Sequence, residues 1–197
     1  MAFESLWYKT RIPDEMIDII ERDLKQDDDN FKEARTRQGI DLQNRDSSTS
    51  WISENYWVSG FLWHYIMVAN RNFHYDLSGW DEGVLQYTKY SDGQYYHWHR
   101  DDGVPSLYTP TGDPKEDFVG QNSRQVRKLS VTVQLSSWED YTGGEVQFIG
   151  DNGKSFFAPK EKGTVIIFDS RLKHRCRKVT SGVRKSIVGW VIGPSWR

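Results

Sequence analysis

The segment GQYYHWHRDDG, residues 93–103, contains two histidines and two aspartates within six positions. Two histidines and one carboxylate can occupy one face of an octahedral Fe(II) ion and leave three positions open for other ligands. Side chains alternate between the two faces of a strand, so His97, His99 and Asp101 would share a face and Asp102 would point the other way. Such a short motif is also compatible with a solvated surface turn, and a further ligand must come from elsewhere in the chain.

His174 is the best candidate for that further ligand. It follows an apolar run that ends at Phe168, and in RLKHRCRK basic residues alternate with Leu172, His174 and Cys176. If this stretch is extended, the basic side chains point to solvent while His174 and Cys176 point inward. The basic run is either a solvated face or a rim that attracts anions. His64, within a helical pattern, and His74, in a polar turn, have no candidate partner nearby and are predicted to be structural.

Arg184 follows His174 by ten positions. A guanidinium group is always charged and binds a carboxylate through two parallel hydrogen bonds. A cation on the strand after the metal histidine could therefore hold the far end of a dicarboxylate whose near end chelates the metal. Lys185 is adjacent and could compete for this role. Trp190 shares the strand face of Arg184, although core packing is the better interpretation for a lone tryptophan.

The elements that would position these residues change type near residue 83. Residues 11–25 have an apolar residue every four positions, and residues 57–69 carry a broad apolar stripe at helical spacing, with Ser53 as a candidate N-cap. Residues 103–125 form a long segment rich in proline and glycine, typical of a functional or disordered loop. The remaining segments after residue 83 are predicted to be antiparallel strands of a sandwich or barrel, with the two helices packed outside it: VLQYTKY, QYYHWH, KLSVTVQLS, EVQFIG, TVIIFD and KSIVGWVI.

Composition narrows the class of protein. The 197 residues carry a net charge of -2, so no overall field favours nucleic acid or an anionic membrane. Aromatic residues make up 14% of the chain, which argues against disorder. The single cysteine excludes an internal disulfide and zinc sites built on several cysteines. The first residues lack the apolar run of a secretory signal, and the most apolar stretch is too short to span a bilayer, so a soluble cytoplasmic protein is expected.

Taken in order, the motifs are those of a known family. The chain resembles the iron(II)- and 2-oxoglutarate-dependent oxygenases, specifically the prolyl 4-hydroxylase-like group. Collagen-type members of that group carry a lysine where this chain has Arg184, and arginine occurs elsewhere in the superfamily. The resemblance covers roughly residues 84–192 and rests on these residues: Tyr90, Gly93, Tyr96, His99, Asp101, Gly143, Gly144, Glu145, His174 and Arg184.

The resemblance implies a mainly β protein with N-terminal helices (α+β), in which a double-stranded β-helix, or jelly roll, forms the core. One oxygenase domain would span residues 1–197, with a helical buttress at 1–82 and the core at 83–193. The implied ligands of Fe(II) are His99, Asp101 and His174, which leaves His97 out. Fe(II) would act with 2-oxoglutarate and O₂ as cosubstrates, and ascorbate is a further candidate cofactor. The residues implied to hold 2-oxoglutarate are Arg184, Tyr90 and, on the polar face of LSVTVQL, Thr132 and Gln134, which could equally pack against polar neighbours.

The resemblance implies hydroxylation of a C–H bond, and a peptidyl proline is the expected substrate. Residues 103–125 could then close as a lid over a peptide, and Tyr95, Trp98 or Tyr108 could stack on the proline ring. A free amino acid or other small molecule is the alternative substrate, whereas a nucleobase is disfavoured by the net charge. A different class of function is a non-catalytic β-sandwich module, in which His97 would complete a closed four-ligand metal site.

Overall fold

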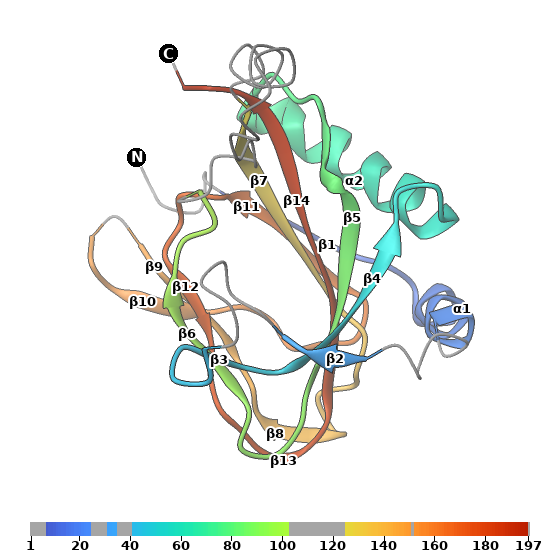
Figure 1. The fold of residues 1–197 in the computed structure, drawn as a ribbon, viewed down its shortest axis with the longest axis vertical. Helices are drawn as coiled ribbons and strands as arrows, with labels where there is room; N and C mark the ends of the chain where they lie inside the picture. The colour runs from blue at the N-terminus through green and yellow to red at the C-terminus, as the bar shows by residue number, and fades with distance from the viewer. Residues whose placement is uncertain (1–6, 25–30, 35–40, 103–124, 151, 197) are drawn as a thin grey trace, which may run out of the picture.

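The computed structural model describes residues 7–24, 31–34, 41–102, 125–150 and 152–196. In this part of the chain, two β-sheets face one another and two helices cover the outer side of the larger sheet (Figure 1). The predicted architecture of helices outside a β-sandwich is therefore confirmed. The predicted lid, which included Tyr108, lies outside the described residues except for its last residue, Gln125.

The larger sheet has the strand order β1-β11-β7-β14-β5-β4-β2, and all its pairings are antiparallel. Its strands are β1 (Trp7–Arg11), β11 (Thr164–Asp169), β7 (Gln125–Gln134), β14 (Arg184–Pro194), β5 (Gly79–Tyr90), β4 (Ser48–Ser53) and β2 (Lys32–Glu33).

The smaller sheet has the order β10-β9-β12-β6-β3, and a two-stranded ribbon, β13-β8, lies at one end of the molecule (Figure 1). These strands are β10 (Ser155–Phe157), β9 (Val146–Ile149), β12 (His174–Cys176), β6 (Tyr95–His99), β3 (Arg45–Asp46), β13 (Val179–Gly182) and β8 (Tyr141–Gly143).

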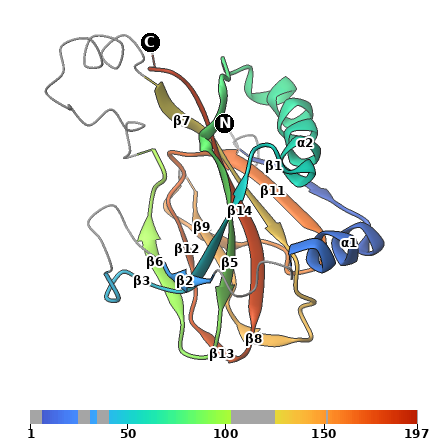
Figure 2. The same cartoon turned by 45° about the vertical axis from the view of Figure 1, so that its right-hand side comes forward.

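Both helices pack on the face of the larger sheet that points away from the smaller one (Figure 2). Helix α1 (Asp14–Leu24) starts with two acidic residues, which complement the positive end of its dipole. Helix α2 (Trp57–Phe73) contributes one buried side chain on nearly every turn. The main core lies between the helices and the sheet and includes Ile20, Leu62, Ile66, Leu85, Val131, Val133 and Ile187. The opposite face of the same strands is left to form the wall of a cavity.

Some sequence predictions about the N-terminal part were wrong. Ser53 does not cap α2, because the N-cap is Tyr56 and the Ser53 hydroxyl instead accepts a hydrogen bond from the Asn55 backbone N–H. Residues 1–82 are also more than a helical buttress. They supply β1, β2 and β4 to the larger sheet and β3 to the smaller one, and the expected boundary at residues 82 and 83 falls inside β5. His64 is exposed on α2, and His74 ends that helix in the left-handed conformation.

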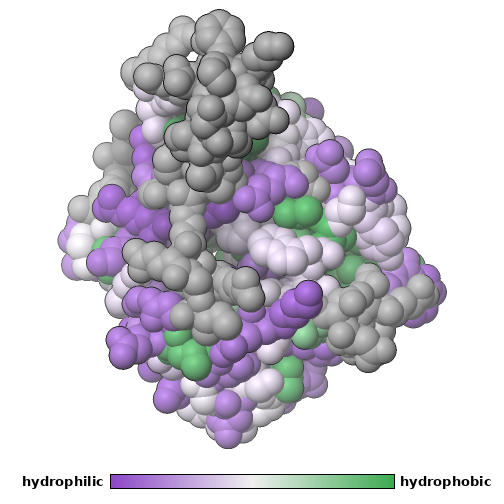
Figure 3. Space-filling model, in the orientation of Figure 1, coloured by the Kyte–Doolittle hydropathy of each residue, from purple (hydrophilic) through white to green (hydrophobic). Residues whose placement is uncertain are grey.

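No described helix is long and apolar enough to cross a membrane. Figure 3 shows the face seen in Figure 1, where small hydrophobic patches are separated by hydrophilic residues. Among the described residues drawn on this face, no broad apolar surface is present.

Candidate metal centre

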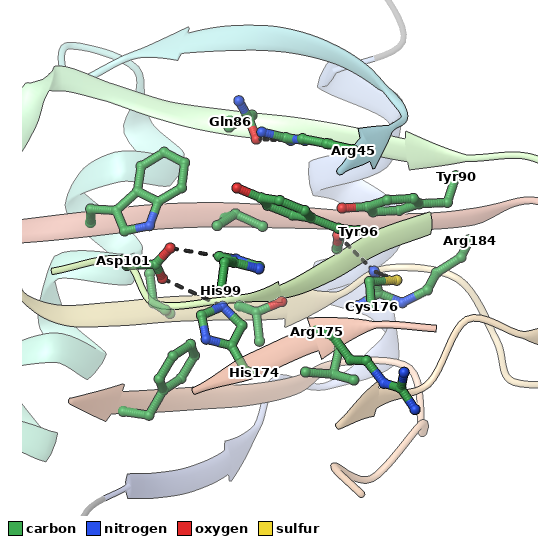
Figure 4. Close-up of a pocket in the computed structure, with 17 residues that line it drawn as sticks. Arg45, Gln86, Tyr90, Tyr96, His99, Asp101, His174, Arg175, Cys176 and Arg184 are labelled. Atoms are coloured by element: carbon green, nitrogen blue, oxygen red, sulfur yellow. Dashed lines mark hydrogen bonds and ion pairs between the residues drawn. The ribbon is translucent and has the colours of Figure 1, made fainter. Parts of the chain in front are cut away.

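Three metal-binding side chains converge where β6 and β12 begin to diverge. His99 ends β6, His174 begins β12, and the two are direct cross-strand partners. Asp101 lies in the bend after β6, where its backbone N–H donates to the Ser170 carbonyl at 2.9 Å. The Nε2 atoms of His99 and His174 lie 3.6 and 3.5 Å from the two Asp101 oxygens, and one ligand atom from each residue falls within 4.8 Å of the others (Figure 4).

Backbone carbonyls fix the orientation of both imidazole rings. His99 Nδ1 lies 2.7 Å from the His97 carbonyl oxygen, and His174 Nδ1 lies 2.9 Å from the Leu172 carbonyl oxygen. Each Nδ1–H therefore donates to the backbone, which leaves each Nε2 as a lone-pair donor facing Asp101. Metal-binding histidines are held by this arrangement, since the second hydrogen bond fixes both tautomer and ring direction.

The Asp101 carboxylate is held from the larger sheet. The Ser130 hydroxyl of β7 donates to Asp101 Oδ2 at 2.7 Å. Burial alone would raise the pKa of Asp101, but His174, His99 and Arg127 together with the Ser130 hydrogen bond bring it below its usual value. The carboxylate therefore stays ionised, as metal binding requires.

His99 is packed against an aromatic ring. The Tyr96 ring stacks on the His99 imidazole with centroids 3.6 Å apart and an interplanar angle of 16°. Burial, followed by the nearby His174 imidazole, lowers the pKa of His99 to about 4. The His99 ring is therefore neutral at physiological pH and available to a metal. Phe168 closes the other side of the site by an edge contact with His174, with centroids 4.9 Å apart.

A β-bulge decides which residues of β6 face the cavity. His99 pairs with His174, but Cys176 pairs with Tyr96, so β6 carries one more residue than β12 over the same stretch. Tyr96 and His99 therefore both point inward, while His97 is exposed. The prediction that His97 shares a face with His99 was wrong, because strict alternation fails at a bulge.

Arg184 lies at the other end of the same cavity. It is only 4% exposed, and its Nη1 lies 3.3 Å from the Ser186 hydroxyl and 3.8 Å from the Cys176 sulfur. Among the described residues, no carboxylate forms an ion pair with it. Tyr90 is its cross-strand partner on β5, and burial raises the pKa of that phenol above its ordinary value. A buried guanidinium without a carboxylate partner is costly, so the site is suited to an anion.

The two glycines of the β8–β9 turn make room for Arg184. Gly143 and Gly144 both have positive φ, 77° and 62°. A Cβ atom on Gly144 would lie 2.9 Å from a Val179 methyl carbon and 3.1 Å from Arg184 Cδ, and one on Gly143 would clash with the Lys178 carbonyl oxygen. The conformation and the space both require glycine, which explains this part of the sequence motif.

The other predicted residues fall in different places. Thr132 lines the cavity with Arg184, whereas Gln134 lies outside it and donates to the Ser136 carbonyl and the Tyr141 hydroxyl, each at 3.1 Å. Lys185 cannot replace Arg184, because its ammonium group contacts Glu21 of α1 at 3.1 Å.

Aromatic residues near the site also differ from expectation. Trp190 is buried, as the core interpretation predicted, but it lines the cavity and is not part of the main core between the helices and the sheet. Tyr95 and Trp98 do not line the cavity. Trp98 instead lies beneath the Arg175 guanidinium, 4.5 Å from its carbon.

Sequence reasoning missed three polar residues of the site. Ser130 could have been found, because it shares the alternating face of Thr132 on β7. Arg45 and Gln86 gave no signal: Arg45 lies in a polar stretch with no periodicity, and only the pairing of β3 with β6 and of β5 with β14 brings them to the cavity.

A family model described as the 2OG-Fe(II) oxygenase superfamily matches residues 85–192, which include the three candidate ligands and Arg184. This chain belongs to that superfamily. Its members use Fe(II), 2-oxoglutarate and O₂. A PKHD-type hydroxylase of Rippkaea orientalis is 30% identical over 107 residues, or 54% of this chain and 41% of that protein. The chain spans about two-fifths of the length of the curated relatives that it matches.

Solved structures show the same fold. A Pseudomonas putida prolyl-4-hydroxylase superposes with a TM-score of 0.72 at 15% identity, covering 94% of this chain and 91% of that one. A Trichoplax adhaerens prolyl hydroxylase in complex with a hypoxia inducible factor peptide gives 0.67 at 14% identity, covering 95% and 83%. The predicted double-stranded β-helix is thus confirmed.

The cofactors of the family fit the residues present. Two imidazoles and one carboxylate are the donor set of a non-haem iron site with open positions. A dicarboxylate fits the same cavity, because Arg184 supplies a buried cation without a described carboxylate partner at the end away from the metal.

Proposed function

We propose that this chain is an Fe(II)- and 2-oxoglutarate-dependent dioxygenase that hydroxylates a C–H bond of its substrate. In this proposal His99, Asp101 and His174 bind the metal, and Arg184 binds the distal carboxylate of 2-oxoglutarate. The observation that supports it most strongly is the presence, in one cavity, of a His–Asp–His cluster, in which Asp101 and His174 are buried and His99 is partly buried, and of a buried arginine that lacks a carboxylate partner among the described residues.

When bound, Fe(II) and 2-oxoglutarate would supply the activation of O₂ that C–H hydroxylation needs. The residues of the chain then bind, orient and exclude water. Ser130 and the two backbone carbonyls hold the three ligands in one geometry, so little reorganisation is needed on binding. Tyr90, whose raised pKa keeps its proton, donates a hydrogen bond to the cosubstrate, and Thr132 lines the same pocket. Gln134 acts indirectly by holding Tyr141.

The whole described chain acts as one oxygenase domain in this proposal. Strands β1, β2 and β4 complete the sheet that carries Ser130 and Arg184, so the N-terminal segment is part of the same fold unit. Dependence on ascorbate stays a prediction.

A peptidyl proline is the proposed substrate, because relatives in sequence are named PKHD-type hydroxylases and a structural neighbour is a prolyl hydroxylase with a bound peptide. A free amino acid or other small acid is the second candidate, favoured by a further buried arginine in the cavity, Arg45. A closed, non-catalytic metal site is disfavoured. Within the described residues only three ligands converge, and His97 points away from them.

The proposal is tested by adding Fe(II) and 2-oxoglutarate to the metal-free protein without oxygen and recording the visible charge-transfer band of a chelated keto acid. We expect a band in the wild type, no band in His99→Ala, and a band that needs far more 2-oxoglutarate in Arg184→Ala. A tightly bound metal without any band would contradict the proposal and support a closed site.

A further inference from the structure

A second buried arginine faces the metal cavity from the N-terminal part of the chain. Arg45 of β3 is only 5% exposed, although charged side chains are rarely buried unless they are paired. Its Nη2 donates to Gln86 Oε1 at 2.6 Å and its Nε to the Ser47 hydroxyl at 3.1 Å. Among the described residues no carboxylate pairs with it. Two neutral acceptors hold the guanidinium in place without neutralising its charge.

The Arg45 guanidinium lies close to the metal ligands. Its carbon is 4.8 Å from the centroid of the Tyr96 ring, and Tyr96 stacks on His99 at 3.6 Å. Figure 4 shows Arg45 lying over the face of Tyr96 that is opposite His99 and reaching toward Gln86. The other terminal nitrogen of Arg45, Nη1, makes no hydrogen bond to any described residue. It is also not one of the described side-chain atoms that are both fully buried and without a partner. One nitrogen of a fixed cation is therefore left for a ligand.

When Fe(II) and 2-oxoglutarate are counted in the site, the positive charge of Arg45 has no counter-charge. The two positive charges of Fe(II) and that of Arg184 would be balanced by Asp101 and by the two carboxylates of 2-oxoglutarate. The positive charge of Arg45, the buried arginine other than Arg184 among the described residues that line the cavity, then remains inside the cavity. Arg175 also lines it, but its Nε donates to Gln147 and its guanidinium lies over Trp98 at the outer side. A buried charge of this kind favours a ligand that carries one negative charge.

A neutral donor faces the same cavity. Trp190 of β14 is 9% exposed, and its Nε1 is enclosed without a hydrogen-bond partner among the described residues. Trp190 is the cross-strand partner of Ser130, which holds Asp101, so its indole lies on the metal side of the cavity. Buried donors are usually paired, so this N–H is an unsatisfied polar group at the wall of the cavity.

We propose that Arg45, positioned by Gln86, binds a carboxylate of the substrate, so that the substrate is a small carboxylic acid or a chain-terminal residue. This inference rests on the proposed function, because the charge count includes Fe(II) and 2-oxoglutarate. A single guanidinium with one free nitrogen matches a singly charged group. It therefore favours a carboxylate over a phosphate, which carries more charge and needs more donors.

The experiment uses the anaerobic Fe(II)–2-oxoglutarate protein and measures equilibrium binding by calorimetry, without turnover. The probes are two matched pairs, N-acetylglycine with its amide and N-acetyl-L-proline with its amide. A short peptide ending in proline, as the free acid and as the amide, distinguishes a chain terminus from a small acid. The variants are Arg45→Gln, Arg45→Lys as a charge-preserving form, and Arg175→Gln as a control that removes a different cavity arginine.

We expect the wild type to bind at least one acid about tenfold or more tightly than its amide, the size of effect that a charge-assisted hydrogen bond gives. Arg45→Gln should lose this preference, Arg45→Lys should keep part of it, and Arg175→Gln should keep it. Equal binding of acid and amide, or no binding of any acid, in the wild type would refute the inference.

A loss of 2-oxoglutarate affinity in Arg45→Gln, as large as in an Arg184 variant, would also refute it, because Arg45 would then serve the cosubstrate. The charge-transfer band in the same samples separates the two proposals. Absence of the band in the wild type contradicts the oxygenase function itself, whereas a normal band without preference for acids contradicts only the carboxylate site.

Discussion

Replacing Arg184 by methionine should have opposite effects on ligand binding and on the stability of the ligand-free protein. Arg184 is 4% exposed and has no carboxylate partner among the described residues. Removing one partner of a buried, hydrogen-bonded charge pair costs about 2–5 kcal/mol of binding, so the Kd for 2-oxoglutarate should rise by roughly 30-fold to several thousand-fold. Methionine fills similar space without a buried charge, so the ligand-free variant should gain on the order of 1–3 kcal/mol of unfolding free energy.

Urea unfolding with and without 2-oxoglutarate, in anaerobic Fe(II)-loaded protein, measures both effects. At a 2-oxoglutarate concentration 100 times the wild-type Kd, the wild type should gain about 2.7 kcal/mol. A variant whose Kd has risen 100-fold or more should gain less than about 0.5 kcal/mol at that concentration. The variant should thus be more stable than the wild type without ligand, and 2-oxoglutarate should shift the difference in unfolding free energy by about 2.3 kcal/mol in favour of the wild type.

Lys185→Met is the matched control, because this neighbouring cation contacts Glu21 on the other face of β14. It should leave the Kd for 2-oxoglutarate unchanged. The reasoning is refuted if Arg184→Met keeps the wild-type Kd, or if the ligand-free variant is less stable than the wild type, since Arg184 would then be a structural residue with its charge already compensated.

Further variants test the metal centre and its support. Ser130→Ala should weaken Fe(II) binding by about 10- to 100-fold, as loss of a group that holds a metal ligand usually does, and metal titration would show it. His97→Ala should keep Fe(II) affinity, whereas His99→Gln should lose it. The opposite result would show that His97, and not His99, is the metal ligand. Burial lowers the pKa of His99 to about 4 in the folded protein, so as the pH falls His99 is protonated in the unfolded chain before it is protonated in the folded one. The metal-free protein should therefore lose stability as the pH drops from about 6.5 to 4. His99→Gln should flatten that dependence in pH-stepped unfolding. Gly144→Ala should displace Arg184 and weaken 2-oxoglutarate binding. An unchanged Kd for 2-oxoglutarate would show that the turn adjusts to the added methyl group without moving Arg184.

Sequence reasoning worked best where one periodicity holds over a whole element. The buried stripe of α2 and the alternation of β7 were both visible, although of the two polar residues that the alternation grouped on β7 only Thr132 lines the cavity with Arg184, and Gln134 does not. The assignment of His99 and His174 to one metal site could not be deduced from spacing alone. It followed from a resemblance whose motifs are far apart in the chain, and the structure brings the two residues opposite one another.

Sequence reasoning failed where local structure breaks the period. The bulge in β6 inserts one residue, so Tyr96 takes the inward place that alternation assigned to His97. Nothing in QYYHWH marks the position of that extra residue. Arg45 was missed for a different reason. Its strand, β3, has only two residues, too few to show any period, and its place beside Tyr96 depends wholly on tertiary pairing.

In the two proposals, Arg184 binds the cosubstrate that members of the superfamily share, whereas Arg45 binds the substrate. Arg184 and the three candidate ligands lie within residues 85–192, the segment that the superfamily model matches, and Arg45 lies outside it. The larger sheet and β12 can therefore build the metal and cosubstrate sites from the common fold, while β3 adds one charge at the edge of the smaller sheet. Because β3 reaches the cavity only by pairing with β6 next to His99, a change in the N-terminal segment could alter which substrate binds without moving any metal ligand.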